Sequence, residues 1–194
     1  MIHDDAATGC DFLVAFGGNM PSDAGAPSHT IRAALHALKE AGVEVIAASA
    51  LYGTPCFPAG AGPDYVNAAA RLRADLEPDG LLAILHDIEA RFGRTRARRW
   101  GQRTLDLDLV ACGDAVLPDL ATYMAWRDLD PAAQMERAPE RLILPHPRLQ
   151  ERAFVLVPLN DVAPDWRHPV SGLTVTEMLA ALPAKSRAEV TALA

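Results

Sequence analysis

Four stretches of the chain have hydrophobic patterns typical of β-strands. The stretch DFLVAF (11–16) is almost continuously apolar and predicts a buried strand, while VEVIAASALY (43–52) is rich in valine, isoleucine and alanine. In YVNAAARLRAD (65–75) and TLDLDLVA (104–111) the residues alternate in character, which predicts two further strands. Glycine, proline or helical patterns separate these stretches, so the four strands are distinct elements.

Two of the intervening segments have apolar residues at helical spacing. Ser28 is a candidate N-cap for a helix that runs to about Ala41, with Gly42 just past its end. Pro78 predicts the first turn of a second helix, and Gly93 predicts its end. The apolar positions of this second helix are Leu81, Leu82, Leu85, Ile88 and Phe92.

The resulting order of strand, helix, strand, strand, helix and strand is the βαββαβ pattern of ferredoxin-like folds. It predicts an α+β core in which a four-stranded antiparallel sheet carries both helices on one face, because the crossovers are right-handed. The other face of the sheet is then expected to be free for loops and ligand.

The chain after the fourth strand extends this core. Residues 117–140 are predicted to be an insertion with a weak helical pattern, since they are polar and contain proline. Further helices are predicted from about Ala153 and over Val175–Leu182. The last dozen residues are expected to fray. We interpret residues 1–194 as a single domain with this insertion.

The composition indicates a globular protein of the cytoplasm. Half of the 194 residues are hydrophobic, which is enough for a core without disulfides or metals. No basic segment followed by an apolar run opens the chain, and no apolar run has the length of a membrane span, so no membrane partner is expected. The cysteines, Cys10, Cys56 and Cys112, lack metal-ligand spacing and suit a reducing compartment, with Cys112 as a core residue.

The charge is unevenly distributed. Residues 91–103 contain six arginines and no acid, so the rest of the chain carries a formal charge of −13 within a net charge of −7. A protein that binds nucleic acid along a broad face is usually basic over that face. The local positive charge therefore predicts a compact anion as ligand, and no nucleic-acid partner.

Two aspartates alternate with leucines in the fourth strand. Leu105, Leu107 and Leu109 face one way, so Asp106 and Asp108 face the other. The rise of a strand separates the two carboxylates by roughly 6–7 Å. This spacing suits one divalent ion or a pair of ions on phosphates, with Mg²⁺ as the natural candidate. An edge strand whose polar face is exposed to solvent has the same pattern, so the aspartate pair alone does not distinguish a metal site from a solvent-exposed face.

The arginines lie in a loop bounded by Gly93 and Gly101. Arginine presents a planar fork of donors to phosphate oxygens. In an empty loop the like charges repel, and a polyphosphate would neutralise them and allow Trp100 to close over the site. The alternative is a solvated charge run whose tryptophan is docked on the core. The arginines from Gly93 to the fourth strand are Arg94, Arg96, Arg98, Arg99 and Arg103.

Two nucleotide-binding motifs are absent from the sequence. No G-x-x-x-x-G-K-[ST] occurs, which excludes a P-loop kinase. The turn Gly17-Gly18-Asn19 is too short for a dinucleotide fingerprint, and we interpret it as a tight turn in which Asn19 satisfies backbone groups.

Several of these stretches resemble one enzyme family, 6-hydroxymethyl-7,8-dihydropterin pyrophosphokinase of folate synthesis. The resemblance covers about residues 12–168 outside the insertion. The family resemblance implies a cytoplasmic enzyme with a ferredoxin-like core that transfers pyrophosphate from ATP to the pterin's hydroxymethyl group and releases AMP. The matching stretches are FLVAFGGN, LYGTPCFPAGAGPDYVNAA, the IE of HDIEARFGRTR, RWGQRTLDLDLV and LILPHPRLQERAFVLVPL.

The resemblance also implies a set of site residues. As catalytic residues it implies Arg94, Arg103, Asp106 and Asp108, with the two aspartates holding two Mg²⁺ ions on the ATP phosphates. As ATP-binding residues it implies Glu89, Arg99, Trp100, Leu109, Arg141, His146 and Arg152. As pterin-binding residues it implies Thr54, Pro55, Phe57, Tyr65, Asn67 and Phe154. Two aromatic walls and an amide suit a flat bicyclic pterin. We expect ATP and the pterin as the partners of a monomer.

The chain departs from the family pattern in places. Its first turn reads GGN where GSN is more usual, and Cys56 and Phe57 replace a commoner Pro-Leu pair. The segment 94–99 is one residue shorter than in some relatives, which leaves the register of Arg96 and Arg98 open.

Other functions compete with direct displacement by the pterin hydroxyl at the β-phosphorus of ATP. A ferredoxin-like RNA binder would use the arginine loop, but the acidic remainder and the lack of an RNP-type aromatic strand disfavour it. A two-metal nuclease or phosphatase would use water as acceptor and would not need the Tyr65, Asn67 and Phe154 pocket. An inactive relative is disfavoured because nearly all matched polar residues are present.

Overall fold

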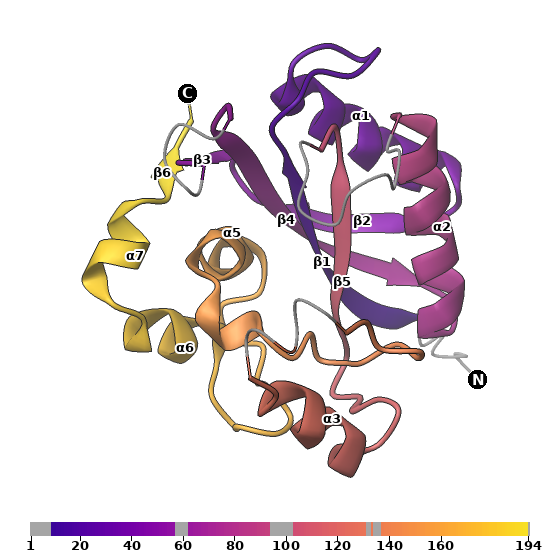
Figure 1. The fold of residues 1–194 in the computed structure, drawn as a ribbon. Coiled ribbons are helices and arrows are strands. Elements are labelled where there is room, and N and C mark those ends of the chain that lie inside the picture. Colours follow the sequence, from indigo (N-terminus) through magenta and orange to yellow (C-terminus); the bar gives the residue numbers. More distant parts are fainter. Residues whose placement is uncertain (1–8, 57–61, 94–102, 131–132, 134–136, 194) are drawn as a thin grey trace, which may run out of the picture.

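Strand β1 (Cys10–Gly18) lies inside the sheet and pairs antiparallel with β4 (Tyr65–Ala74) on one side and with β5 (Asp106–Cys112) on the other. The computed structural model describes residues 9–56, 62–93, 103–130, 133 and 137–193. Within them the strand order is β5-β1-β4-β3, the order of a ferredoxin-like sheet, so the predicted α+β fold is confirmed (Figure 1).

The predicted strand over residues 43–52 is two strands. Strand β2 (Glu44–Ala48) pairs with β4 near Arg73, whereas β3 (Tyr52–Thr54) pairs with β4 near Asn67. Between them Ser49 uses its side chain, which accepts a hydrogen bond from the backbone N–H of Ala69 at 2.9 Å. This side-chain bond takes the place of one backbone bond of the ladder between the two strands.

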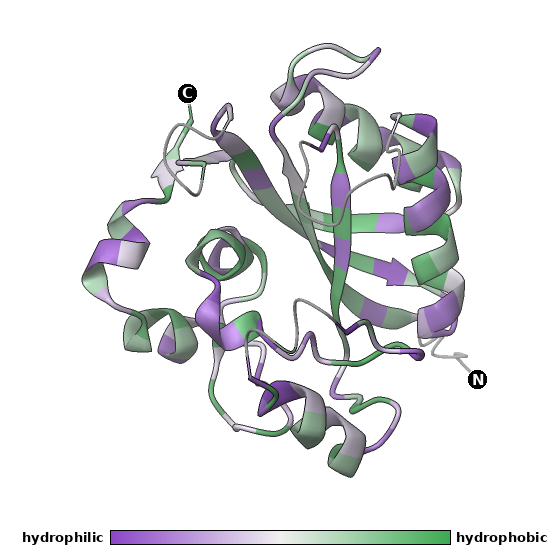
Figure 2. Ribbon diagram, in the orientation of Figure 1, coloured by the Kyte–Doolittle hydropathy of each residue, from purple (hydrophilic) through white to green (hydrophobic). Residues whose placement is uncertain are grey.

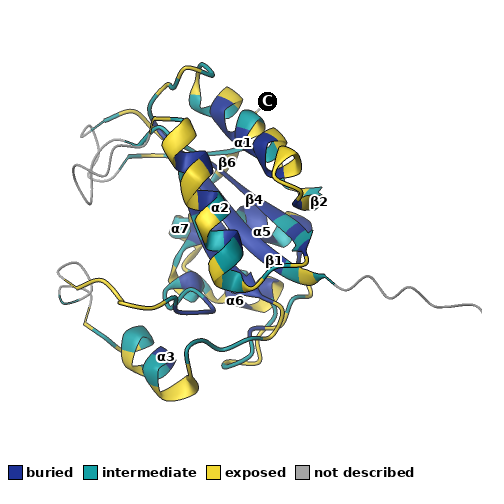
Figure 3. Cartoon of the chain, turned by 90° about the vertical axis from the view of Figure 1, so that its right-hand side faces the viewer, coloured by how far each residue is buried: buried dark blue, intermediate teal, exposed yellow. Residues whose placement is uncertain are grey.

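Helices α1 (Pro27–Glu40) and α2 (Pro78–Arg91) cover one face of the sheet, with their buried sides turned toward it (Figure 3). The first helix begins two residues earlier than predicted, and its N-cap is Ala26 rather than Ser28. The reason is Pro27, whose fixed φ suits the first helical position. Gly42 and Gly93 follow the two helices with φ of +82° and +81°, as predicted for helix ends.

The second face of the sheet is not free along its whole length. The 3₁₀ turn η1 (Leu149–Glu151) and helices α5 (Ala153–Val162) and α6 (Val175–Ala181) form a second core with this face. Helix α5 lies directly on β4 and is apolar round most of its circumference, so it needs cover on several sides (Figure 2). The expectation of an open face is therefore wrong over this part of the sheet.

The C-terminal residues do not fray within the part of the chain that the structure describes. Helix α7 (Ala184–Ala188) is followed by β6 (Thr191–Ala192), which pairs antiparallel with β3. The N–H of Leu193 also donates to the carbonyl of Leu51 at 2.8 Å. The prediction is wrong because β3 has an open hydrogen-bonding edge, which the tail covers.

The insertion carries a short helix that is anchored in the core. Helix α3 (Leu120–Arg127) contains Tyr123, which is fully buried and lies 3.1 Å, Oη to Nε2, from buried His168. Nδ1 of His168 accepts from the N–H of Val170 at 3.1 Å, so the neutral ring carries its proton on Nε2 and donates to Tyr123. Burial lowers the pKa of His168.

None of the described helices is both long enough and apolar enough to cross a bilayer.

The lowered pKa of His168 predicts a pH-dependent stability. The unfolded chain takes up this proton near pH 6.5 and the folded chain only at lower pH, so the free energy of unfolding falls as pH drops below about 6.5. We expect urea denaturation between pH 7 and pH 5 to show a larger loss for the wild type than for His168→Gln, which cannot titrate. Equal losses would show that His168 does not contribute.

Candidate functional site

One row of residues crosses the sheet where helix α5 leaves it uncovered. Gly17 pairs with Asp106 of β5 on one side and with Asn67 of β4 on the other. In the next row Ala15 pairs with Asp108. Because paired residues point to the same face, Asp106, Asp108 and Asn67 share one surface, and roughly 10 Å separates the two outer strands. The predicted common orientation of the two aspartates is confirmed.

The glycine in this row keeps the space between the carboxylate and the amide open. A Cβ built on Gly17 would lie 3.5 Å from Oδ1 of Asn67, so a side chain there would stand between the two strands. Leu105, Leu107 and Leu109 point to the opposite face and belong to the core under α1 and α2. Alternate residues of β5 therefore pack into the hydrophobic core on one face of the sheet and present carboxylates on the other face.

Each aspartate has an arginine beside it. Arg103, at the end of the arginine loop, forms an ion pair with Asp106. Arg152, which precedes α5, places Nη1 3.7 Å from Oδ2 of Asp108. Burial lowers the pKa of Arg152, and the neighbouring Asp108 opposes that shift. Two cations from distant parts of the chain therefore meet at the carboxylate pair.

His146 is a neutral hydrogen-bond donor next to these cations. Its backbone N–H donates to the carbonyl of Val110 at 2.8 Å, which ties the segment to β5. Its Nδ1 accepts from the N–H of Arg148 at 3.1 Å, so the proton lies on Nε2. Burial, together with the charge of Arg152, lowers the pKa of His146 to about 3. The imidazole therefore stays uncharged near neutral pH.

Three of the residues predicted to contact a pterin lie together at the other end of the row. Nδ2 of Asn67 donates to Oγ1 of Thr54 at 2.9 Å, and Tyr65 pairs with Thr54 and shares the face of Asn67. Burial raises the pKa of Tyr65. Phe154 is 41 % exposed, so its ring is available to a ligand, and Pro55 is also exposed. Phe57 lies outside the described residues.

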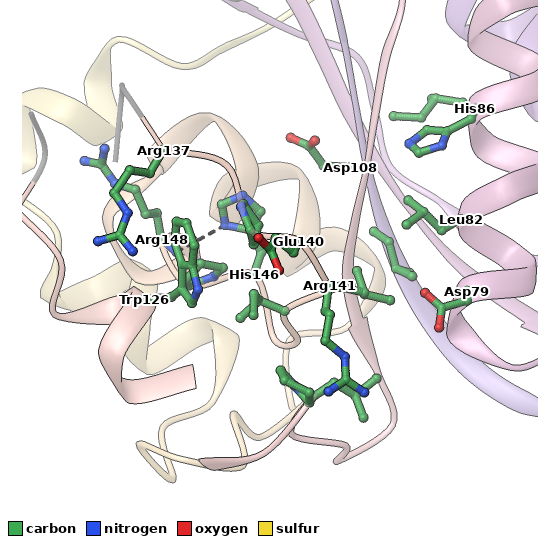
Figure 4. Close-up of a pocket in the computed structure, with 18 of the residues that line it drawn as sticks. Asp79, Leu82, His86, Asp108, Trp126, Arg137, Glu140, Arg141, His146 and Arg148 are labelled. Carbon is green, nitrogen blue, oxygen red and sulfur yellow. Dashed lines mark hydrogen bonds between the residues drawn. The ribbon is translucent and has the colours of Figure 1, made fainter. Parts of the chain in front are cut away.

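A cavity of about 840 Å³ opens beside Asp108 (Figure 4), and none of the described residues predicted to contact a pterin lines it. Four of the predicted ATP-binding residues line it, namely Leu109, Arg141, His146 and Arg152. Figure 4 shows Asp108 and Arg141 on the walls of this space, opposite Leu82 and His86 of α2. The volume lies within the usual range for a small-molecule site. Arg94, Arg99 and Trp100 lie outside the described residues.

Glu89 of α2 binds the backbone of β5, the strand that carries the two aspartates. Its carboxylate is 2 % exposed and accepts a hydrogen bond from the N–H of Leu107 at 2.7 Å. Strand β5 is at the edge of the sheet, so this bond satisfies a backbone donor that has no neighbouring strand. Glu89 thus holds the aspartate strand against α2, which is a positioning contact.

Asn19 has a role that the sequence showed only as a turn residue. Its Oδ1 accepts from the N–H of Arg103 at 3.0 Å, and its Nδ2 donates to the carbonyl of Pro63 at 3.2 Å. Its own N–H donates to the carbonyl of Arg103 at 3.0 Å. A Cβ on Gly18 would lie 2.6 Å from the carbonyl oxygen of Thr104, so a side chain at this position would require the backbone to shift. The interpretation of Asn19 as a satisfier of backbone groups is confirmed, and those groups belong to two site loops.

The carboxylate pair fits a metal that takes most of its ligands from substrate and water. Among the described residues no group of three or more His, Cys, Asp or Glu side chains could enclose an ion. Asp106 and Asp108 supply oxygen donors only, and Mg²⁺ commonly binds through one or two carboxylates plus phosphates and water. A structural zinc site is a poor match for this donor set.

The fold and the site define a ferredoxin-like α+β protein in which a carboxylate pair lies between a cluster of Thr54, Tyr65 and Asn67 and a cation-lined cavity. The sequence profile of one family, 7,8-dihydro-6-hydroxymethylpterin-pyrophosphokinase (HPPK), matches residues 13–164. The chain belongs to this family.

Curated relatives agree with that assignment. Proteins named 2-amino-4-hydroxy-6-hydroxymethyldihydropteridine pyrophosphokinase from Synechocystis sp. and Pseudomonas aeruginosa are 42% and 40% identical to this chain. The first alignment covers 72% of this chain and 60% of the relative, and the second covers 88% and 90%.

Solved structures share the fold. The crystal structure of wild-type Plasmodium falciparum HPPK-DHPS aligns with a TM-score of 0.61 at 14% identity, over 89% of this chain and 44% of that one. This chain therefore spans less than half of that protein, and the likeness is one of fold.

The bonds of Asn19 predict a stability effect. Asn19→Ala leaves the N–H of Arg103 and the carbonyl of Pro63 without their partners, which should cost about 1–3 kcal/mol of the free energy of unfolding. Urea denaturation measures this loss. Asn160→Ala is the matched control, because the bond between Asn160 and Thr176 lies at the surface, and we expect it to cost less than about 1 kcal/mol. Equal losses would contradict a special role for Asn19.

Proposed function

We propose that this chain transfers pyrophosphate from ATP to the hydroxymethyl group of 6-hydroxymethyl-7,8-dihydropterin and releases AMP, as a step of folate biosynthesis. The observation that supports the proposal most directly is the row Asp106, Gly17 and Asn67, in which a carboxylate and an amide lie on one surface. The names of the curated relatives support the same reaction. The two substrates would meet over Gly17.

The nucleotide would occupy the cavity, with its phosphates at the end formed by Asp108, His146 and Arg152. Arg152 supplies positive charge, and the neutral His146 supplies an N–H donor without adding to cation repulsion. Asp106 and Asp108 would hold two Mg²⁺ ions on the phosphates. When bound, Mg²⁺ neutralises phosphate oxygens and orients them for displacement.

The pterin would lie between the rings of Tyr65 and Phe154, over the amide of Asn67. One N–H of this amide is used by Thr54, which fixes its orientation and turns Oδ1 toward Gly17. That oxygen can accept from the N–H groups of the pterin edge. An amide held in this way favours a flat heterocycle that carries hydrogen-bond donors and acceptors side by side along one edge. Water or a simple alcohol has no such edge and is therefore a poorer acceptor substrate.

The reaction is a direct displacement. The hydroxymethyl oxygen attacks the β-phosphorus of ATP, a new oxygen–phosphorus bond forms, and the bond from the β-phosphorus to the oxygen of the α-phosphate breaks. AMP leaves with the electron pair, and the hydroxyl proton passes to the surrounding solvent or phosphate oxygens. Positioning and charge neutralisation supply most of the rate enhancement in such transfers. Arg103, paired with Asp106 before substrates bind, lies where it can exchange that carboxylate for a phosphate.

The direct test is AMP formation from ATP and Mg²⁺, measured with and without 6-hydroxymethyl-7,8-dihydropterin. We expect AMP only when the pterin is present, because the pterin hydroxyl is the acceptor. Release of phosphate or pyrophosphate without pterin would indicate a hydrolase instead.

The carboxylate pair predicts two inactive variants. Asp106→Ala and Asp108→Ala should each lower AMP formation at least about a hundredfold, because each removes charge stabilisation at the reacting phosphates. Melting temperatures should stay close to the wild type, since both side chains point away from the core under α1 and α2. Asp114→Ala, an exposed aspartate just beyond β5, is the control and should keep full activity. Near-normal turnover in either site variant would refute the metal assignment.

The arginines predict a change in rate rather than affinity. Arg103→Ala and Arg94→Ala should lower kcat by about 10²–10³-fold with a smaller effect on ATP binding, because their charge acts on the phosphates during transfer. Steady-state kinetics and equilibrium ATP binding separate the two effects, and Arg187→Ala, exposed on α7, is the control. A loss confined to affinity would mean that these arginines only hold substrate.

A further inference from the structure

The inserted segment, residues 117–140, is anchored at both its base and its helix. At the base, Leu117 and Leu144 exchange backbone hydrogen bonds of 2.8 and 3.2 Å. On helix α3 the buried Tyr123 bonds to His168, whose ring lies edge-on to Trp166 at 5.8 Å between centroids. Helix α3 is therefore held in place by the bond between Tyr123 and His168, neither of which lines the cavity.

Trp126 follows Tyr123 by three residues, so the two side chains lie on adjacent positions of α3. Tyr123 enters the core, and Trp126 lines the cavity beside Asp108. Figure 4 shows Trp126 and Arg148 on one wall, across the space from Leu82 and His86 of α2. The insertion thus supplies a wall of the cavity that the ferredoxin-like core does not contain.

The same wall carries positive charge from the insertion. The guanidinium of Arg137 lies 5.8 Å from the centroid of the Trp126 ring, a cation–π distance. Arg137 and Glu140 also line the cavity. The indole therefore presents a flat apolar surface to the cavity and also holds a cation at its rim.

We propose that the inserted segment completes the nucleotide site, with Trp126 in contact with the nucleoside part of ATP. The inference rests on the proposed function in that the cavity is taken to hold ATP. The phosphates of ATP are assigned to the end of the cavity formed by Asp108, His146 and Arg152. The indole of Trp126 is neutral and does not stabilise an anion, so it is assigned to the nucleoside. A nucleoside has flat and apolar surfaces that pack on an aromatic ring, and such contacts are sensitive to removal of the ring.

The test measures binding of the Mg²⁺ complex of α,β-methylene-ATP, whose bridging carbon prevents the transfer, by isothermal titration calorimetry. Trp126→Ala should weaken this binding about tenfold, and Trp126→Phe, which keeps an aromatic ring, should lose less. Leu120→Ala is the matched control, because Leu120 is on the same helix, 56 % exposed and outside the cavity lining. Unchanged binding by Trp126→Ala, or an equal loss in Leu120→Ala, would overturn the proposal.

A second ligand separates nucleoside contact from general distortion of the site. Inorganic tripolyphosphate with Mg²⁺ carries the phosphates alone, so its affinity should be the same for Trp126→Ala and the wild type. An equal loss for tripolyphosphate and the ATP analogue would overturn the nucleoside assignment. Binding does not require turnover. If Trp126→Ala weakens binding tenfold but the wild type forms no AMP, the role of Trp126 is supported and the proposed reaction is refuted. If the wild type forms AMP but Trp126→Ala binds the analogue normally, the proposed reaction is supported and the role of Trp126 is refuted.

Discussion

The hydrogen-bonded register of β1 between β4 and β5 is the constraint on which the rest of the site depends. It places Gly17 opposite both Asp106 and Asn67, so two strands that are far apart in the chain present one carboxylate and one amide to the same space. A shift of either strand by one residue would turn its polar residues toward the core. The leucines of β5 prevent that shift, because they are buried under α1 and α2. Core packing therefore sets the geometry of the polar surface.

The electrostatics of the site follow from this arrangement. Two carboxylates on one strand repel each other, and the structure places Arg103 and Arg152 beside them from opposite directions along the chain. His146 stays neutral because burial and Arg152 lower its pKa to about 3. In the proposed function a metal-bound polyphosphate would meet cations and carboxylates that are already adjacent, and it would exchange partners among them.

Segments of the proposed site are held in place by hydrogen bonds from other parts of the chain. Asn19 binds the backbone of Arg103 and of Pro63, and Glu89 binds the backbone of Leu107. The insertion follows the same principle, since Tyr123 anchors α3 through His168 while Trp126 reaches the cavity. In each case a buried polar bond positions a backbone segment, which in turn aims a side chain at the ligand space.

Local patterns of the sequence determined much of this protein. The alternation in β5 set the common face of Asp106 and Asp108, Pro78 and Gly93 marked the limits of α2, and the order of elements defined the ferredoxin-like core, because these features depend only on neighbouring residues. Only the tertiary structure decided that β3 and β6 pair, that α5 covers part of the second sheet face, that Asn19 binds the backbone of Arg103, and that Trp126 lines the cavity. These features arise from contacts between residues far apart in the chain, such as Asn19 with Arg103 or Tyr123 with His168. No periodicity or spacing within a single segment encodes such contacts.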